Sequence, residues 1–217
     1  MDVLGLGRSL PVLGFPHIQY RVPASHTKEG KERLRAYYES LGRFVDMFSR
    51  VETAVTLTLW HYAKTAPEIA KIVFAGTKVE VGSTYIKQLA VATKASPERQ
   101  ADLEDVLQQL GIINGARNQI LHYGATSVAE GNAVVSNALK AKGEPDTFPI
   151  SPTALDQMTS DLNKIVAHLN YVHLGNPDGY TILTSPMHDT WQYKHRVVKK
   201  TQSTKAEGRR KKRRDPK

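Results

Sequence analysis

The chain has 217 residues, a length typical of one domain with appendages, and 40% of them are hydrophobic, which is enough to form a core. It contains no cysteine, which excludes disulfides and thiolate metal sites and fits a reducing compartment. No run of about 18 apolar residues occurs, and the N-terminus lacks the basic start of a signal peptide. We therefore expect a cytoplasmic protein that does not contact a membrane.

The net charge of +9 is distributed unevenly. Residues 194–217 contain 12 Lys or Arg and 2 acidic residues, whereas the other 193 residues contain 18 basic and 19 acidic ones. Because a run such as "EGRRKKRRDPK" cannot be buried, we expect a disordered basic tail at 194–217. This tail could bind nucleic acid through phosphates, act as a localisation signal, or only increase solubility.

The first half of the chain predicts an extended arm and a long helix. Residues 1–29 contain Pro and Gly around the alternating "HIQYRV", which indicates an arm with one short strand. A long helix is expected from Lys31 to Lys64, because apolar residues recur there at steps of three and four. They are Leu34, Tyr38, Leu41, Phe44, Phe48, Val51, Val55, Leu59 and Tyr62. A capping box of Thr65 and Glu68 then predicts a short helix that ends near Gly76.

Three more helices are expected in the second half. Their predicted starts are Ser83, Ser96 and Ser151, and the last two are each followed by Pro. Residues 125–138 favour a β-hairpin that turns at 130–132, and residues 176–193 a loop or strand. Since the connections are short, we predict a mainly all-α fold. It would be an antiparallel bundle of four to five helices over 30–193, with the hairpin, the N-terminal arm and the basic tail attached.

One cation lies where the helix ending at Gly124 should be apolar. On a helical wheel, Arg117 falls in the middle of the arc formed by Leu103, Val106, Leu107, Leu110, Ile113 and Leu121. Asn114, Asn118 and His122 follow one edge of that arc. An isolated buried guanidinium is costly and does not lose its proton. Arg117 must therefore meet a carboxylate, a bound anion or water in a cleft, and Glu52 on the long helix is a candidate partner.

The same residue types are suited to phosphodiester chemistry. Arg117 can bind phosphate oxygens in its planar fork, and His122 can transfer a proton near neutral pH. Asn118 lies four residues before His122 on the same helix face and can orient it. In RNA the substrate's own 2′-hydroxyl can be the nucleophile, so neither a metal nor a protein nucleophile is required. The alternative is a structural pair of Arg117 with Glu52 in a protein that only binds a nucleotide or a partner.

The segment "RNQILH" near the end of a late helix resembles the motif of the HEPN superfamily, in which an Arg and a polar residue precede a His. The earlier "FSRVETAVTLTLW" is similar to the first long helix of bacterial HEPN-like proteins, and the resemblance covers about residues 31–175. It implies a helical bundle that dimerises with two motif helices across a shared cleft. It also implies metal-independent RNA cleavage without a cofactor, often by a toxin with a partner antitoxin or by a defence effector.

The resemblance assigns roles to particular residues. Arg117 would stabilise the transition-state phosphate, His122 would be the acid or base, and Asn118 is the polar residue beside the Arg. Around these three catalytic candidates we take Asn114, Tyr123 and Glu52 as candidate substrate-binding residues. Since many HEPN relatives are inactive, a non-catalytic binding module remains the alternative. A third hypothesis is a nucleic-acid binder that works through its tail alone.

Two further patterns give smaller expectations. Gly111 and Gly115 with Ala116 predict a close helix contact, either at a dimer seam or within one bundle. His168 and His173 are five residues apart, whereas ligands on one helical face are three or four apart, so we expect no metal site there.

Overall fold

A computed structural model describes residues 28–123, 125–129, 132–136, 147–175 and 191–194. Within these ranges the chain is mainly helical, which confirms the predicted helical class. Most of the predicted arm, part of the turn at 130–132, residues 176–190 and nearly all of the basic tail lie outside the described residues. None of the described helices is both long enough and apolar enough to cross a membrane.

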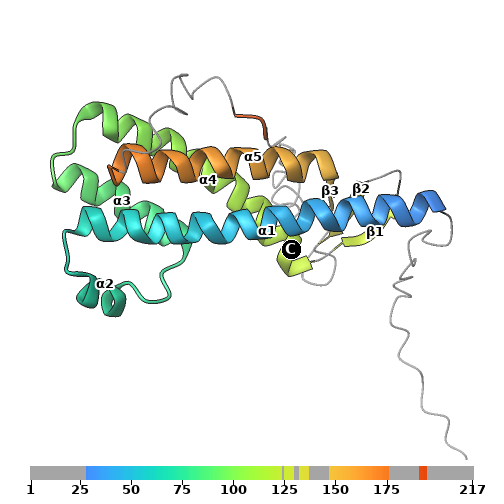
Figure 1. The fold of residues 1–217 in the computed structure, drawn as a ribbon, viewed down its shortest axis with the longest axis horizontal. Helices are drawn as coiled ribbons and strands as arrows, with labels where there is room; N and C mark the ends of the chain where they lie inside the picture. The colour runs from blue at the N-terminus through green and yellow to red at the C-terminus, as the bar shows by residue number, and fades with distance from the viewer. Residues whose placement is uncertain (1–27, 124, 130–131, 137–146, 176–190, 195–217) are drawn as a thin grey trace, which may run out of the picture.

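Five α-helices and three strands make up the described part (Figure 1). The helices are α1 (Lys28–Ala63), α2 (Pro67–Val73), α3 (Val79–Ala92), α4 (Pro97–Tyr123) and α5 (Pro152–His168), and α5 continues into the π-helical turn η1 (Leu169–His173). The strands β1 (Ala125–Ala129), β2 (Asn132–Ser136) and β3 (Thr147–Ile150) form one antiparallel sheet in that order. The register shifts once between β1 and β2, between Ala125 and Ser127.

The apolar seam of α1 forms one side of the core. Most of the predicted positions are buried, from Phe44 to Tyr62, and they pack with side chains of α3, α4 and α5. The prediction was wrong at Tyr38, which is 59% exposed, while Tyr37 is 2% exposed. Tyr37 precedes Phe44 by seven residues, or two turns, so it continues the buried stripe that Tyr38 leaves.

Two predicted helix starts were wrong and two agree with the structure. The N-cap of α2 is Ala66 without a side-chain cap, because the hydroxyl of Thr65 donates to the carbonyl of Ala63 instead. Helix α3 begins at Val79, four residues before the expected Ser83. The hydroxyl of Ser151 accepts a hydrogen bond from the Ala154 amide at 3.0 Å, as an N-cap should, and Ser96 directly precedes α4.

The helices do not all alternate in direction, so the prediction of a fully antiparallel bundle was wrong. Along α1 and α5, Arg43 pairs with Asp156 and Tyr62 with His173, which means that these neighbours run the same way. The colours in Figure 1 show this direction for both helices. Helix α4 is antiparallel to α5, because the earlier α4 residue pairs with the later residue of α5 and η1. Asp102 meets His173, whereas Gln109 meets Asp161. Helix α3 is antiparallel to α4, since Glu80 meets Asn114 whereas Lys87 meets Glu104, so α3 runs the same way as α1. The alternation therefore fails at the connection through α2, between α1 and α3.

The last described segment, Trp191–Lys194, is fixed to α4 and α5 without forming a strand. The carboxylate of Asp161 has 0% exposure and accepts hydrogen bonds from the amides of Gln192 and Tyr193. The same carboxylate accepts a third bond, from the side chain of Gln109. The basic tail therefore starts from a point that is anchored on the helical core.

Candidate functional site

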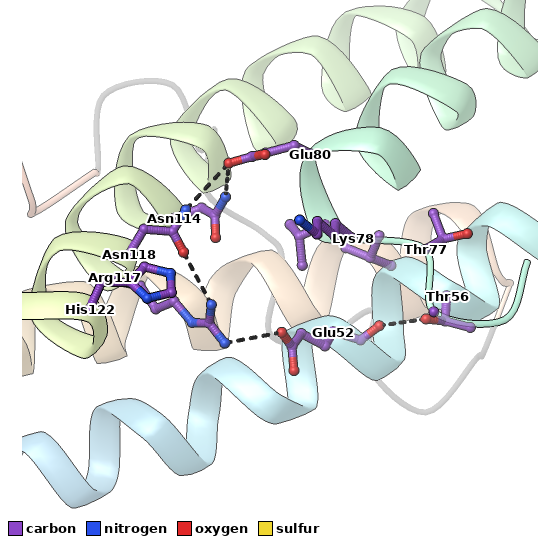
Figure 2. Close-up of a pocket in the computed structure, with 12 residues that line it drawn as sticks. Glu52, Thr56, Thr77, Lys78, Glu80, Asn114, Arg117, Asn118 and His122 are labelled. Carbon is purple, nitrogen blue, oxygen red and sulfur yellow. Dashed lines mark hydrogen bonds and ion pairs between the residues drawn. The ribbon is translucent and has the colours of Figure 1, made fainter.

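A cleft of about 540 Å³ lies between α1, α4 and the segment that leads into α3 (Figure 2). A volume of this size is within the range of small-ligand sites. Five of the six residues proposed from the sequence line it, and they are Glu52, Asn114, Arg117, Asn118 and His122. The sixth is Tyr123, whose side chain lies outside the described part of the structure.

Helical spacing brings the four α4 residues to one wall. Asn114, Arg117, Asn118 and His122 are separated by steps of three, one and four residues, so they occupy neighbouring positions on two successive turns. Glu52 faces this wall from α1. The chain turn at Gly76, where φ is +70°, precedes the segment that closes the third side.

Arg117 lies at the border between the apolar core and the cleft. Its side chain is 29% exposed, and its guanidinium carbon is 5.0 Å from the centroid of the Phe48 ring. The cation therefore rests on an aromatic face, which is a favourable arrangement for Arg. This contact explains how a charge can occupy the middle of an apolar arc on the helical wheel.

Most of the hydrogen-bonding capacity of Arg117 is unused within the described part of the chain. Its Nη1 donates to the amide oxygen of Asn118 at 3.1 Å, which is the hydrogen bond that the described residues offer it. The distance from Nη2 to the Glu52 carboxylate is 3.6 Å, so this contact is an ion pair but too long for a hydrogen bond. The Nε atom is buried and has no partner among the described residues. Since a guanidinium has five N–H donors, the Nη groups of Arg117 can still donate hydrogen bonds to an oxyanion.

Asn118 and Asn114 are both bound to a carboxylate that the sequence did not suggest. The Glu80 carboxylate, on the first turn of α3, accepts hydrogen bonds from Asn114 at 2.8 Å and from Asn118 at 3.4 Å. Asn114 is 5% exposed, so its amide requires such a partner. With a helix start at Ser83, Glu80 would precede α3 and would have no predicted position relative to α4. For this reason the sequence did not predict the contact.

His122 lines the cleft at the end of α4 and is exposed. Its imidazole makes no hydrogen bond to any described residue, so both ring nitrogens are available to a ligand. Lys78, Thr77 and Thr56 also line the cleft and were missed from the sequence, which offered no pattern to connect them. The cleft thus combines two acidic side chains, two basic side chains, two amides and an imidazole.

A second polar cluster lies at the other end of α4, in the core. Asp102 binds Nδ1 of His168 at 2.9 Å and Nε2 of His173 at 2.8 Å, and Nδ1 of His173 bonds the Tyr62 hydroxyl at 2.9 Å. The two histidines share a face although they are five residues apart, because η1 has the wider π-helical turn. Among the described residues no group of three or more metal-ligating side chains has a geometry for a metal ion.

Burial by itself would raise the pKa of the Asp102 carboxyl, but the two histidines reverse this effect. The hydrogen bonds and charges of His168 and His173 hold that pKa far below its ordinary value. Asp102 is therefore an ionised carboxylate that ties α4 to α5 and η1. The cluster is a cross-link within the core and lies away from the cleft residues.

The chain was also compared with known proteins. None of the family models, curated proteins or solved structures that were searched matches it. The relation to HEPN proteins therefore stays a prediction that rests on the motif residues.

Proposed function

We propose that the protein is a HEPN-like, metal-independent endoribonuclease whose site is the cleft beside Arg117. The observation that supports this most directly is a partly buried guanidinium on a cleft wall that it shares with Asn118 and His122, with donors that no described residue occupies. A phosphodiester has the oxyanions that such a group binds. The His122 imidazole, which has no hydrogen-bond partner among the described residues, can accept or donate the proton that the reaction moves.

In the proposed reaction the 2′-hydroxyl of the RNA attacks the adjacent phosphorus and its proton passes to a base. The bond to the 5′-oxygen of the next nucleotide breaks, and this oxygen takes up a proton. The products are a 2′,3′-cyclic phosphate and a 5′-hydroxyl end. Arg117 neutralises the charge that develops on the phosphoryl oxygens, and His122 transfers one of the two protons. Asn118 holds the guanidinium in place.

The active form would be a homodimer in which two α4 helices face each other. Gly111 and Gly115 are exposed, and a Cβ atom built on either meets no atom within 4 Å, so these glycines serve no packing within the described part of one chain. They lie on the side of α4 that continues to Asn118 and His122. A second copy could therefore approach closely there and enclose the RNA. A toxin or defence role, with an antitoxin as partner, would follow from the same resemblance.

The test is cleavage of RNA in EDTA by the wild type and by the Arg117→Ala and His122→Ala variants. We expect each variant to lose on the order of 100-fold or more in rate. His61→Ala and Arg50→Ala are matched controls, since these exposed residues of α1 do not line the cleft. An RNA with a 2′-deoxy nucleotide at the cleavage position should resist the wild type. Equal rates in all the variants would show that a contaminating nuclease is responsible.

One observation favours a second candidate function. The ion pair of Arg117 with Glu52 agrees with a non-catalytic module that binds a nucleotide or a partner and uses the pair for structure. That function predicts a large loss of stability in Glu52→Ala. The nuclease needs no such stabilising pair. A small loss, of about 1 kcal/mol or less, is what we expect from a contact that is long and from a Glu52 side chain that is 47% exposed. Thermal unfolding of Glu52→Ala separates the two.

A further inference from the structure

A chain of polar contacts crosses the cleft wall from α3 to Arg117. Figure 2 shows it as consecutive dashed lines from Glu80 to Asn118 and from Asn118 to the guanidinium. In this chain Nδ2 of Asn118 donates to Glu80 at 3.4 Å, and Oδ1 of Asn118 accepts from Arg117 at 3.1 Å. In each of these two hydrogen bonds the donor and the acceptor have fixed roles, and the Glu80 carboxylate determines the direction of donation in both.

The carboxylate decides which way the Asn118 amide faces. Ionised Glu80 can only accept hydrogen bonds, so the NH₂ group of Asn118 must turn toward it and the amide oxygen must turn toward Arg117. Asn114 donates to the same Glu80 oxygen at 2.8 Å, and it is nearly buried, which holds the carboxylate against α4. Without this acceptor the amide could rotate and present its NH₂ group to the guanidinium, where two donors would oppose each other.

We propose that Glu80 is a positioning residue of the cleft, which orients Asn118 and through it fixes Arg117 for an incoming phosphate. This inference rests on the proposed function for its effect on catalysis. Glu80 does not touch the reacting atoms in this proposal, so it should affect the rate of the chemical step more than the affinity for RNA.

The structure offers a matched control for a merely structural role. Lys87 of α3 and Glu104 of α4 form an ion pair at 3.1 Å, which also joins these two helices but lies outside the cleft. If Glu80 only held α3 against α4, then Glu80→Ala and Glu104→Ala should behave alike. If Glu80 positions Arg117, the two variants should differ.

The first experiment measures kcat and KM for RNA cleavage. We expect Glu80→Ala to lose on the order of 10- to 100-fold in kcat, with a change of KM of less than about threefold. Glu80→Gln should retain most of the activity because its amide oxygen can still accept from Asn118. Glu104→Ala should match the wild type. Equal kinetics of Glu80→Ala and Glu104→Ala would overturn the proposal.

The second experiment does not depend on activity. The side-chain N–H signals of Asn118 and Arg117 in ¹⁵N-labelled protein should shift in Glu80→Ala and remain in place in Glu104→Ala. If the wild type cleaves no RNA but these signals shift in Glu80→Ala, the proposed nuclease function is wrong, whereas the positioning role of Glu80 is still supported. Unchanged signals in Glu80→Ala would overturn the positioning role. Should Glu80→Ala not fold, Glu80→Asp replaces it, since a carboxylate shortened by one carbon withdraws from Asn118.

Discussion

At the scale of single residues, Arg117 contacts the Phe48 ring, the amide oxygen of Asn118 and the carboxylate of Glu52. Its place in an apolar arc predicts that it needs a partner, with Glu52 as a candidate, and the ion pair of the two residues agrees with this prediction. The Phe48 ring below the guanidinium and the bond to Asn118 were not foreseen. A helical wheel gives the direction of a side chain but not the identity of the atoms that it meets on another helix.

Asp102 gives a prediction for acid stability. Because its pKa is lowered in the folded protein, the unfolded chain binds the proton more readily, and its contribution to stability is lost as pH falls below the unfolded value near 3.8. We expect wild type to be more stable than Asp102→Asn near neutral pH. This difference in unfolding free energy should narrow by about 1 kcal/mol between about pH 5 and about pH 3. Urea titrations of both proteins measure it, and a constant difference would contradict the assignment.

At the level of elements, η1 shows how helix type decides which residues meet. The expectation that residues five apart cannot share a face holds for an α-helix, but His168 and His173 both reach Asp102 because the chain widens to a π-turn there. The hydrogen bonds of both histidines to Asp102 need this wider turn, which ends at His173, two residues before Gly175, where φ is +71°. The sequence contains no local signal for a π-turn, so this cross-link was missed.

The glycines of α4 give a prediction at the same scale. Gly111→Ala and Gly115→Ala should each stabilise the monomer by about 0.5–1 kcal/mol, since alanine is the better helix former and the added methyl meets nothing within 4 Å. If the glycines form the dimer seam, the same variants should weaken dimerisation in sedimentation experiments.

Two other glycines serve as controls for this test. Gly42→Ala should stabilise α1 without any effect on dimerisation, because its position is also open but lies away from α4. Gly82→Ala should be less stable than Gly42→Ala relative to the wild type, because the new Cβ atom would lie 3.1 Å from a methyl group of Val55. If dimerisation is unchanged in both Gly111→Ala and Gly115→Ala, these glycines are not part of the dimer seam.

At the scale of the whole molecule, the tail and the cleft should contribute separately to RNA binding. Residues 199–217 contain ten Lys or Arg and two acidic residues, and they follow the segment anchored by Asp161. Their deletion should weaken RNA binding and reduce its dependence on salt, because fewer counterions are released. The melting temperature and the cleavage rate at saturating RNA should be the same in the deletion variant as in the wild type. Loss of all binding, with no effect of Arg117→Ala, would instead support the tail as the sole binding element.

Local sequence patterns were sufficient to predict the helical class, the long first helix, the cap of α5 and the group of α4 residues that line one wall of the cleft. These features depend on spacing along one element, where 3.6 residues per turn fixes which side chains share a face. Tertiary structure alone decided that α1 and α5 are parallel, that Glu80 bonds both amides, and that Asp161 anchors the last segment. Each of these contacts joins residues more than 30 positions apart, and their proximity depends on how whole helices pack, which local periodicity does not specify.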